Sequence, residues 1–146
     1  MSFKELPIMA EKKKGTLLFY PYISKKSSSN IKKVLSTRWI GQGPAVDKFE
    51  KKFQQVFANK NSALATGSGT DSLHLAYLLA GLKKGDEVIT TVFTCTATNI
   101  PLLYIGAKIK FADIDPVTMN ISIPSVKKLI SKKTKAIVCV HYGGLP

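Results

Sequence analysis

The sequence predicts an α/β protein with a mostly parallel β-sheet in three layers, in which helices cover both faces of the sheet. Runs such as 87–91 and 136–140 are apolar and β-branched without regular alternation, as expected of strands buried on both faces. Segments with apolar residues at helical spacing separate these runs, which indicates strand–helix–strand units. About four strands are expected before the sequence stops, in mid-fold, at Pro146.

Two helices are expected between residues 24 and 58. Residues 1–20 are interpreted as a basic lead-in with no clear period. A helix is expected over 24–37, where Ile31 and Val34 lie on one apolar face. Two glycines and a proline within 39–44 end this helix in a tight turn.

A second helix is expected to begin at Pro44, because proline fits the first turn of a helix, and to run to about Ala58. Phe49 and Phe53 lie at helical spacing within it. Further strands are expected over 62–66, 87–91, 108–112 and 135–140, and further helices over 70–82, 96–105 and 122–130. Pro101 would be a first-turn proline if its helix began near residue 99.

The formal net charge of +13, from 22 basic and nine acidic residues, raises the possibility of nucleic-acid binding. The basic residues argue against it, because all except Arg38 are lysines, scattered in pairs over expected helix faces without interleaved aromatic side chains. Solvated helix faces are therefore the preferred interpretation of the charge. We expect no nucleic-acid partner.

The sequence also indicates a soluble protein of the cytoplasm. The longest apolar runs, around 77–82 and 100–107, are too short to span a bilayer, so no membrane partner is expected. The N-terminal segment has no apolar core typical of a signal peptide. Cys95 and Cys139 are isolated, which indicates neither a zinc site nor a disulfide framework.

A glycine loop at residues 66–72, with the sequence Thr-Gly-Ser-Gly-Thr-Asp-Ser, lies between an expected strand and an expected helix. Glycines let the backbone approach an anion closely, and the first N–H groups of a helix have no partner within it. The helix dipole also favours negative charge there. The loop therefore predicts a phosphate site, although an ordinary connection would look similar.

Polar and glycine-rich residues gather where the expected strands end, at 66–72, 91–98, 113–115 and 141–146. Open α/β sheets bind ligands at the carboxyl ends of their strands. This convergence predicts a small-molecule pocket. The glycine loop matches neither the dinucleotide fingerprint nor the P-loop, although another phosphate-binding α/β module stays an alternative.

Several motifs occur in a fixed order at 39–44, 49–50, 67–75, 85–90, 93–98, 106–107, 111–115, 118–121 and 140–146. In this order the chain, from about Tyr22 to its end, resembles the nucleotide-sugar aminotransferases of the DegT/StrS type. The resemblance implies the large domain of the PLP-dependent transferase fold type I, with residues 21–146 as its N-terminal part. It also implies pyridoxal 5′-phosphate (PLP), glutamate as amino donor, a nucleotide-diphosphate keto-sugar as acceptor and a homodimer. A role in polysaccharide or amino-sugar biosynthesis follows from it.

The resemblance assigns cofactor-binding residues. The N–H groups of Thr70 and Asp71, with Gly69 ahead of them, would hold the cofactor phosphate. An aromatic residue usually covers the cofactor ring in this family, and its position falls on Cys95 here. Either Cys95 lies against the ring, or Phe93 supplies the aromatic face; Phe93 is equally consistent with a core residue.

The resemblance places the sugar nucleotide near the 39–44 turn, with Trp39, Gly41, Gly43 and Pro44 as substrate-binding residues. A packed tryptophan beside a helix-breaking turn is an equal alternative. Asp113 and Asp115 are interpreted as turn residues and not as a metal site. His141 is interpreted as a structural residue, with contact to cofactor or substrate as the alternative.

The resemblance supplies no catalytic residue within the sequence. The Schiff-base lysine and the acid that pairs with the pyridinium nitrogen would lie beyond Pro146, so we expect this piece alone to be inactive. A dehydratase or lyase of the same fold, with histidine in place of that lysine, stays an alternative.

Overall fold

The computed structural model describes residues 21–59 and 61–146, so the expected lead-in over 1–20 lies outside the described residues. Two compact units make up the chain, Met1–Lys48 and Phe49–Pro146. Within the described ranges, no helix is long and apolar enough to cross a membrane.

Two expected helices are present in the first part of the chain. Helix α1 spans Ser27–Ser36 and α2 spans Pro44–Val56, with Pro44 as the first helical residue. Arg38 adopts a left-handed φ of 63° in the connection between them. The predicted helices over 24–37 and 44–58 are therefore confirmed.

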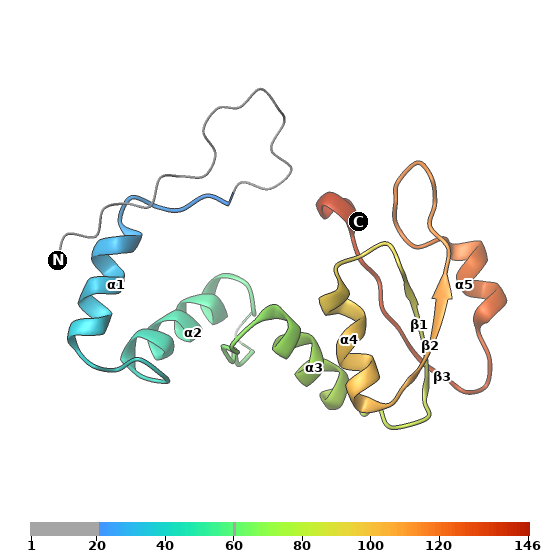
Figure 1. Cartoon of the computed structure of the whole chain (residues 1–146), viewed down its shortest axis with the longest axis horizontal. Helices are drawn as coiled ribbons and strands as arrows, with labels where there is room; N and C mark the ends of the chain where they lie inside the picture. The colour runs from blue at the N-terminus through green and yellow to red at the C-terminus, as the bar shows by residue number, and fades with distance from the viewer. Residues whose placement is uncertain (1–20, 60) are drawn as a thin grey trace. The chain divides into compact units, whose positions relative to one another are not determined.

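The second unit alternates helices and strands (Figure 1). Its elements are α3 (Gly69–Leu79), β1 (Glu87–Thr91), α4 (Thr96–Ile105), β2 (Lys108–Ala112), α5 (Ile123–Leu129), β3 (Thr134–Ile137) and the short 3-10 helix η1 (Tyr142–Gly144). Gly106 ends α4 in a left-handed conformation, with a φ of 78°, that glycine adopts without steric cost.

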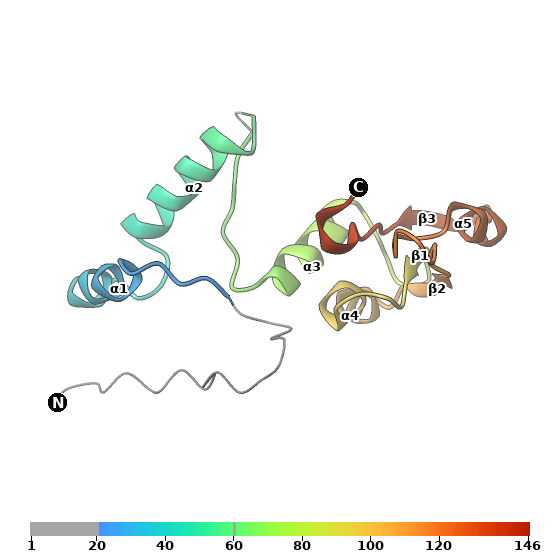
Figure 2. The same cartoon turned by 90° about the horizontal axis from the view of Figure 1, so that it is seen from above.

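The strands form one parallel sheet in the order β2-β1-β3. Val88 of β1 lies opposite Ile109 of β2 on one side and Ala136 of β3 on the other. Helices α3 and α4 lie on one face of the sheet and α5 on the other (Figures 1 and 2). The predicted fold class, a parallel sheet within three layers, is confirmed.

Each face of the sheet has its own apolar core. Between the sheet and helices α3 and α4 lie Tyr77, Leu82, Val88, Leu102 and Ala107. Between the sheet and α5 lie Ile89, Ala112, Ile121 and Val126. The adjacent β1 residues Val88 and Ile89 face opposite cores, so β1 is buried on both faces. This explains its continuous apolar pattern.

Buried polar groups connect the end of β1 to α4. The Thr90 hydroxyl donates to Asn99 Oδ1 at 3.0 Å, and Asn99 Nδ2 donates to the Thr91 carbonyl at 2.9 Å. The Tyr77 hydroxyl donates to the Thr98 carbonyl at 3.0 Å, and burial raises the pKa of Tyr77. These bonds fix the position of α4 relative to the carboxyl end of β1.

Three expected details differ from the structure. Residues 62–66 form no strand, so the described residues contain three strands and not four. No described strand pairs with 62–66, and apolar sequence alone does not form a ladder. Strand β3 ends at Ile137 and not at 140. Helix α4 spans Thr96–Ile105, as predicted, so Pro101 lies inside the helix and not in its first turn.

Candidate functional site

The glycine loop is held by the cap of α3. Ser68 is the N-cap residue, with an extended backbone, and its Oγ accepts the N–H of Asp71 at 3.1 Å. The same hydroxyl donates to Asp71 Oδ2 at 2.9 Å. Two bonds between Ser68 and Asp71 therefore hold the loop against the first turn of the helix.

The N-terminus of α3 keeps two N–H groups for a ligand. The first helical hydrogen bond runs from Ser72 N–H to the Ser68 carbonyl at 3.1 Å, so the N–H groups of Gly69 and Thr70 precede the helical ladder. A Cβ built on Gly69 would meet no atom within 4 Å. Two N–H groups that have no partner within the helix, the helix dipole and the open space beside Gly69 suit a phosphate group.

The Asp71 N–H, which the resemblance assigned to the phosphate, donates to the Ser68 hydroxyl. This part of the structure therefore offers Gly69 and Thr70 as donors and uses Asp71 in the cap. A Cβ on Gly67 would lie 3.0 Å from Asp71 Oδ2, so a larger residue there would require the Asp71 carboxylate to shift.

Hydroxyl groups connect the two ends of the loop. The Oγ atoms of Thr66 and Ser72 lie 2.6 Å apart, and the Thr66 hydroxyl also contacts the Ser68 carbonyl at 2.9 Å. A cavity of about 420 Å³ adjoins the loop. It is lined by Phe49, Glu50, Phe53, Ala58, Ser62, Ala63, Leu64, Ala65, Thr66, Ser68, Gly69 and Ser72. Glu50 supports its wall, because its carboxylate accepts the N–H of Ala65 at 2.8 Å.

An aromatic pair lies where β1 and β3 end. The rings of Phe93 and Tyr142 are in contact, with centroids 4.9 Å apart and an interplanar angle of 41°. Both rings remain accessible, Phe93 at 39% and Tyr142 at 50% exposure. The Phe93 N–H donates to the Thr91 hydroxyl at 3.0 Å, which ties the ring to the end of β1.

Cys95 occupies a different position from the aromatic pair. It is the N-cap residue of α4 and is exposed as a free thiol. Sequence reasoning singled out Phe93 and Cys95 but assigned no role to Tyr142. The available signal for Tyr142 was its position a few residues after the last strand, before two glycines.

The acidic residues at this edge act in a turn. Asp115 Oδ1 accepts the N–H groups of Val117 and Thr118, both at 2.9 Å, and these bonds lower the pKa of Asp115. Asp113 Oδ1 accepts the N–H of Ile114 at 2.8 Å. No group of three metal-ligating side chains occurs in the described parts of the chain. His141 precedes η1, and its carbonyl accepts the Gly144 N–H at 3.0 Å.

The expected substrate residues lie in the other unit. Trp39 covers Gly43, because a Cβ on Gly43 would lie 3.0 Å from Trp39 Cε3. The indole stays 59% exposed, and Gly41 has open space around it. Pro44 begins α2. The turn is therefore ordered around Trp39, with the ring accessible.

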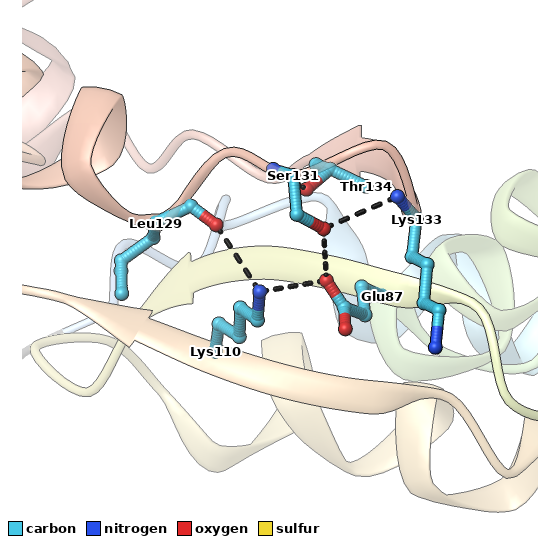
Figure 3. Close-up of polar contacts among 6 residues, drawn as sticks. All are labelled: Glu87, Lys110, Leu129, Ser131, Lys133 and Thr134. Atoms are coloured by element: carbon cyan, nitrogen blue, oxygen red, sulfur yellow. Dashed lines mark hydrogen bonds and ion pairs between the residues drawn. The ribbon is translucent and has the colours of Figure 1, made fainter.

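The opposite edge of the sheet, where the strands begin, carries a polar network (Figure 3). Lys110 Nζ and the Ser131 hydroxyl each contact Glu87 Oε2 at 2.6 Å. Lys110 also donates to the Leu129 carbonyl at 3.2 Å. The hydrogen bond from Lys110, then that from Ser131, lowers the pKa of Glu87. The network ties β1 and β2 to the connection between α5 and β3.

The comparisons with known proteins fit this arrangement. Residues 21–146 match the model of the DegT/DnrJ/EryC1/StrS aminotransferase family. The chain belongs to this family. The match covers every residue that the structure describes.

A curated relative in the family is similar over most of the chain. The spore coat polysaccharide biosynthesis protein SpsC of Bacillus subtilis is 38% identical over 124 residues, which are 85% of this chain and 32% of SpsC. The chain therefore spans about a third of the length of the curated relatives it matches.

Two solved structures share the fold. The sugar aminotransferase CalS13 of Micromonospora echinospora is 35% identical, with a TM-score of 0.77 over 86% of this chain and 34% of CalS13. The GDP-4-keto-6-deoxy-D-mannose-3-dehydratase of E. coli, solved with bound hydrated PLP, is 31% identical. Its TM-score is 0.72 over 82% of this chain and 32% of the dehydratase.

Proposed function

We propose that this chain forms the phosphate- and ring-binding part of the PLP site in a sugar aminotransferase. The reaction transfers an amino group from glutamate to a keto-sugar carried on a nucleotide diphosphate. The observation that carries the proposal is the N-terminus of α3, where the N–H groups of Gly69 and Thr70 precede the helical hydrogen bonds and a Cβ on Gly69 would meet open space. Family membership and the PLP held by the dehydratase relative support it.

The chain's own residues bind and orient the cofactor. The N–H groups of Gly69 and Thr70 donate to the phosphate, and Ser68 and Asp71 hold those donors in place. The accessible pair of Phe93 and Tyr142 covers one side of the ring. PLP supplies the electron sink that the transfer of an amino group needs.

The remaining assignments of the site are part of the same proposal. Cys95, at the N-terminus of α4, borders the ring site. Trp39, Gly41, Gly43 and Pro44 contact the sugar nucleotide, for which the exposed indole of Trp39 offers a stacking surface. The Schiff-base lysine and the acid at the pyridinium nitrogen lie beyond Pro146, so residues 1–146 alone are inactive.

The protein acts in the cytoplasm as a homodimer, in the biosynthesis of polysaccharides or amino sugars. Nucleotide sugars and glutamate are cytoplasmic metabolites. The relation to a spore coat polysaccharide biosynthesis protein supports this context. Neither nucleic acid nor a membrane is a partner.

A sugar dehydratase is the second candidate function. One solved relative, 31% identical, is a PLP-containing dehydratase that acts on a GDP-linked keto-sugar. The two functions differ at the position of the Schiff-base lysine, which the dehydratases of this fold replace with histidine. The products differ as well, because amination adds nitrogen to the sugar whereas dehydration removes a hydroxyl group.

The test is an assay of the product of the complete open reading frame. The purified protein is incubated with PLP, glutamate and a panel of nucleotide-diphosphate keto-sugars, and the sugar products are identified by mass spectrometry. The proposal predicts bound PLP and an amino-sugar, with one 2-oxoglutarate formed for each. Retained PLP with a deoxygenated sugar would establish the dehydratase. A protein that neither retains PLP nor converts any of the sugars would contradict both candidate functions.

A further inference from the structure

The η1 turn, Tyr142–Gly144, brings the Tyr142 ring into contact with Phe93. Its own residues, however, do little to stabilise its backbone conformation. Gly143 and Gly144 both adopt positive φ angles, 61° and 81°. Glycine pairs of this kind lose much conformational entropy on folding, so the turn needs support from outside. The question is which residue holds it.

The Asn120 side chain contacts both ends of this turn. Its Oδ1 accepts the N–H of Tyr142 at 2.9 Å, and its Nδ2 donates to the carbonyl of Leu145 at 3.0 Å. One amide therefore satisfies a backbone donor and a backbone acceptor on either side of the two glycines. Of the side chains described, Asn120 alone bonds to both ends of the turn.

Asn120 itself is fixed by its own loop. Its carbonyl accepts the N–H of Asp115 at 2.8 Å, and its N–H donates to the Thr118 hydroxyl at 3.3 Å. The next residue, Ile121, is buried in the core between the sheet and α5. The side-chain amide of Asn120 thus extends from a rigid loop. A residue can position another segment only if its own backbone is held in this way.

We infer that Asn120 is a positioning residue for the cofactor ring site. By holding the backbone on both sides of Gly143 and Gly144, it keeps the Tyr142 ring against Phe93. The two rings then form one aromatic wall at the carboxyl end of β1. The inference rests on the proposed function, because the wall serves a ring only if PLP binds there.

The first readout needs no cofactor. In the product of the complete reading frame, Asn120→Ala removes the acceptor for the Tyr142 N–H, so hydrogen exchange at that amide should accelerate about fivefold to tenfold. Asn120→Asp keeps an acceptor for Tyr142 but loses the donor to Leu145, so it should preserve more of the protection. Ser131→Ala, at the opposite edge of the sheet, is the control and should leave the Tyr142 amide unchanged.

The second readout is PLP affinity in a double-mutant cycle. Asn120→Ala and Tyr142→Ala should each weaken PLP binding by about fivefold, and the double variant should lose little more, because one residue acts through the other. Additive losses, or an unchanged exchange rate in Asn120→Ala, would overturn the inference. If the wild-type protein fails to bind PLP, the proposed function falls and this inference with it. If PLP binding is normal and hydrogen exchange at the Tyr142 amide does not change in Asn120→Ala, this inference is overturned and the proposed function is not.

Discussion

At the edge of the sheet where the strands begin, Lys110 and Ser131 both bond to Glu87, whereas the N-terminus of α3 retains unused hydrogen-bonding capacity. There, the N–H groups of Gly69 and Thr70 have no partner within α3. The two regions belong to the same unit. Their polar residues nevertheless differ in what they leave available.

The difference separates residues that hold the fold from residues that can bind. A polar group whose bonds are made within the chain has little left for a ligand, and its loss is a loss of stability. A donor that faces open space contributes little to folding and much to binding. Substitutions in the two regions should therefore affect different measurements.

The largest effect is expected at Gly69. Gly69→Pro removes one donor, and proline fits this position because Gly69 is the first helical residue and Ser68 before it is extended. Gly69→Ala is the matched control, since both variants add a Cβ but only proline removes the N–H. We expect the proline variant to bind PLP about 10- to 100-fold more weakly than the alanine variant, by fluorescence titration. Equal affinities would remove Gly69 from the site.

The next effect concerns the cap that supports the donors. Ser68→Ala removes the acceptor for the Asp71 N–H and should lower the free energy of unfolding by about 1 kcal/mol. Ser68→Thr retains a hydroxyl and should lose much less. Urea denaturation measures both. Full stability in Ser68→Ala would show that the cap is not needed to order the loop.

At the edge of the sheet where the strands begin, Glu87→Gln should lower the free energy of unfolding and leave PLP affinity within about twofold of that of the wild type. The pKa of Glu87 lies below its ordinary value of 4.5, chiefly because Lys110 bonds to the charged form. Its contribution is therefore present above about pH 4.5 and is lost as the pH falls through the lowered value. The gap in urea midpoint between wild type and Glu87→Gln should be widest at neutral pH and should narrow in acid. A loss of PLP affinity in Glu87→Gln as large as that in Gly69→Pro would contradict the distinction between the Glu87 network and the N-terminus of α3.

The smallest effect is expected for Asp115→Asn. Backbone N–H groups of Thr118 and Val117 lower the pKa of Asp115 from its ordinary 3.8, without a cation among the causes. An amide oxygen can still accept these bonds, so at neutral pH the urea midpoint should fall less than for Glu87→Gln. In acid, wild type loses the Asp115 contribution as the pH falls through the lowered pKa. A larger loss for Asp115→Asn at neutral pH would mean that its charge, and not its geometry, holds the turn.

Local features of the site could be predicted from the sequence. The helix after the glycine loop was expected from residue 70 and begins at Gly69, because Ser68 and Asp71 form a cap within four residues. The buried strand β1 was expected over the residues it occupies, since its pattern reflects burial on both faces. Short-range chemistry and burial leave signals in the sequence.

Long-range partners left no such signal. Residues 62–66 have the composition of a strand, but a strand exists only where another pairs with it. The contact of Phe93 with Tyr142, and the bonds of Asn120 to residues 22 and 25 positions away, depend on how the loops meet at the end of the sheet. These contacts follow from topology and not from any local pattern.

The most direct test of the phosphate site is an amide NMR spectrum of the ¹⁵N-labelled protein during titration with PLP. The Gly69 and Thr70 amide signals should move furthest downfield, because their N–H groups bond to the phosphate. Pyridoxal, which lacks the phosphate, should leave both amide signals unshifted. PLP should leave the amide signals around Glu87 unshifted. PLP binding that leaves Gly69 and Thr70 unmoved would contradict the account.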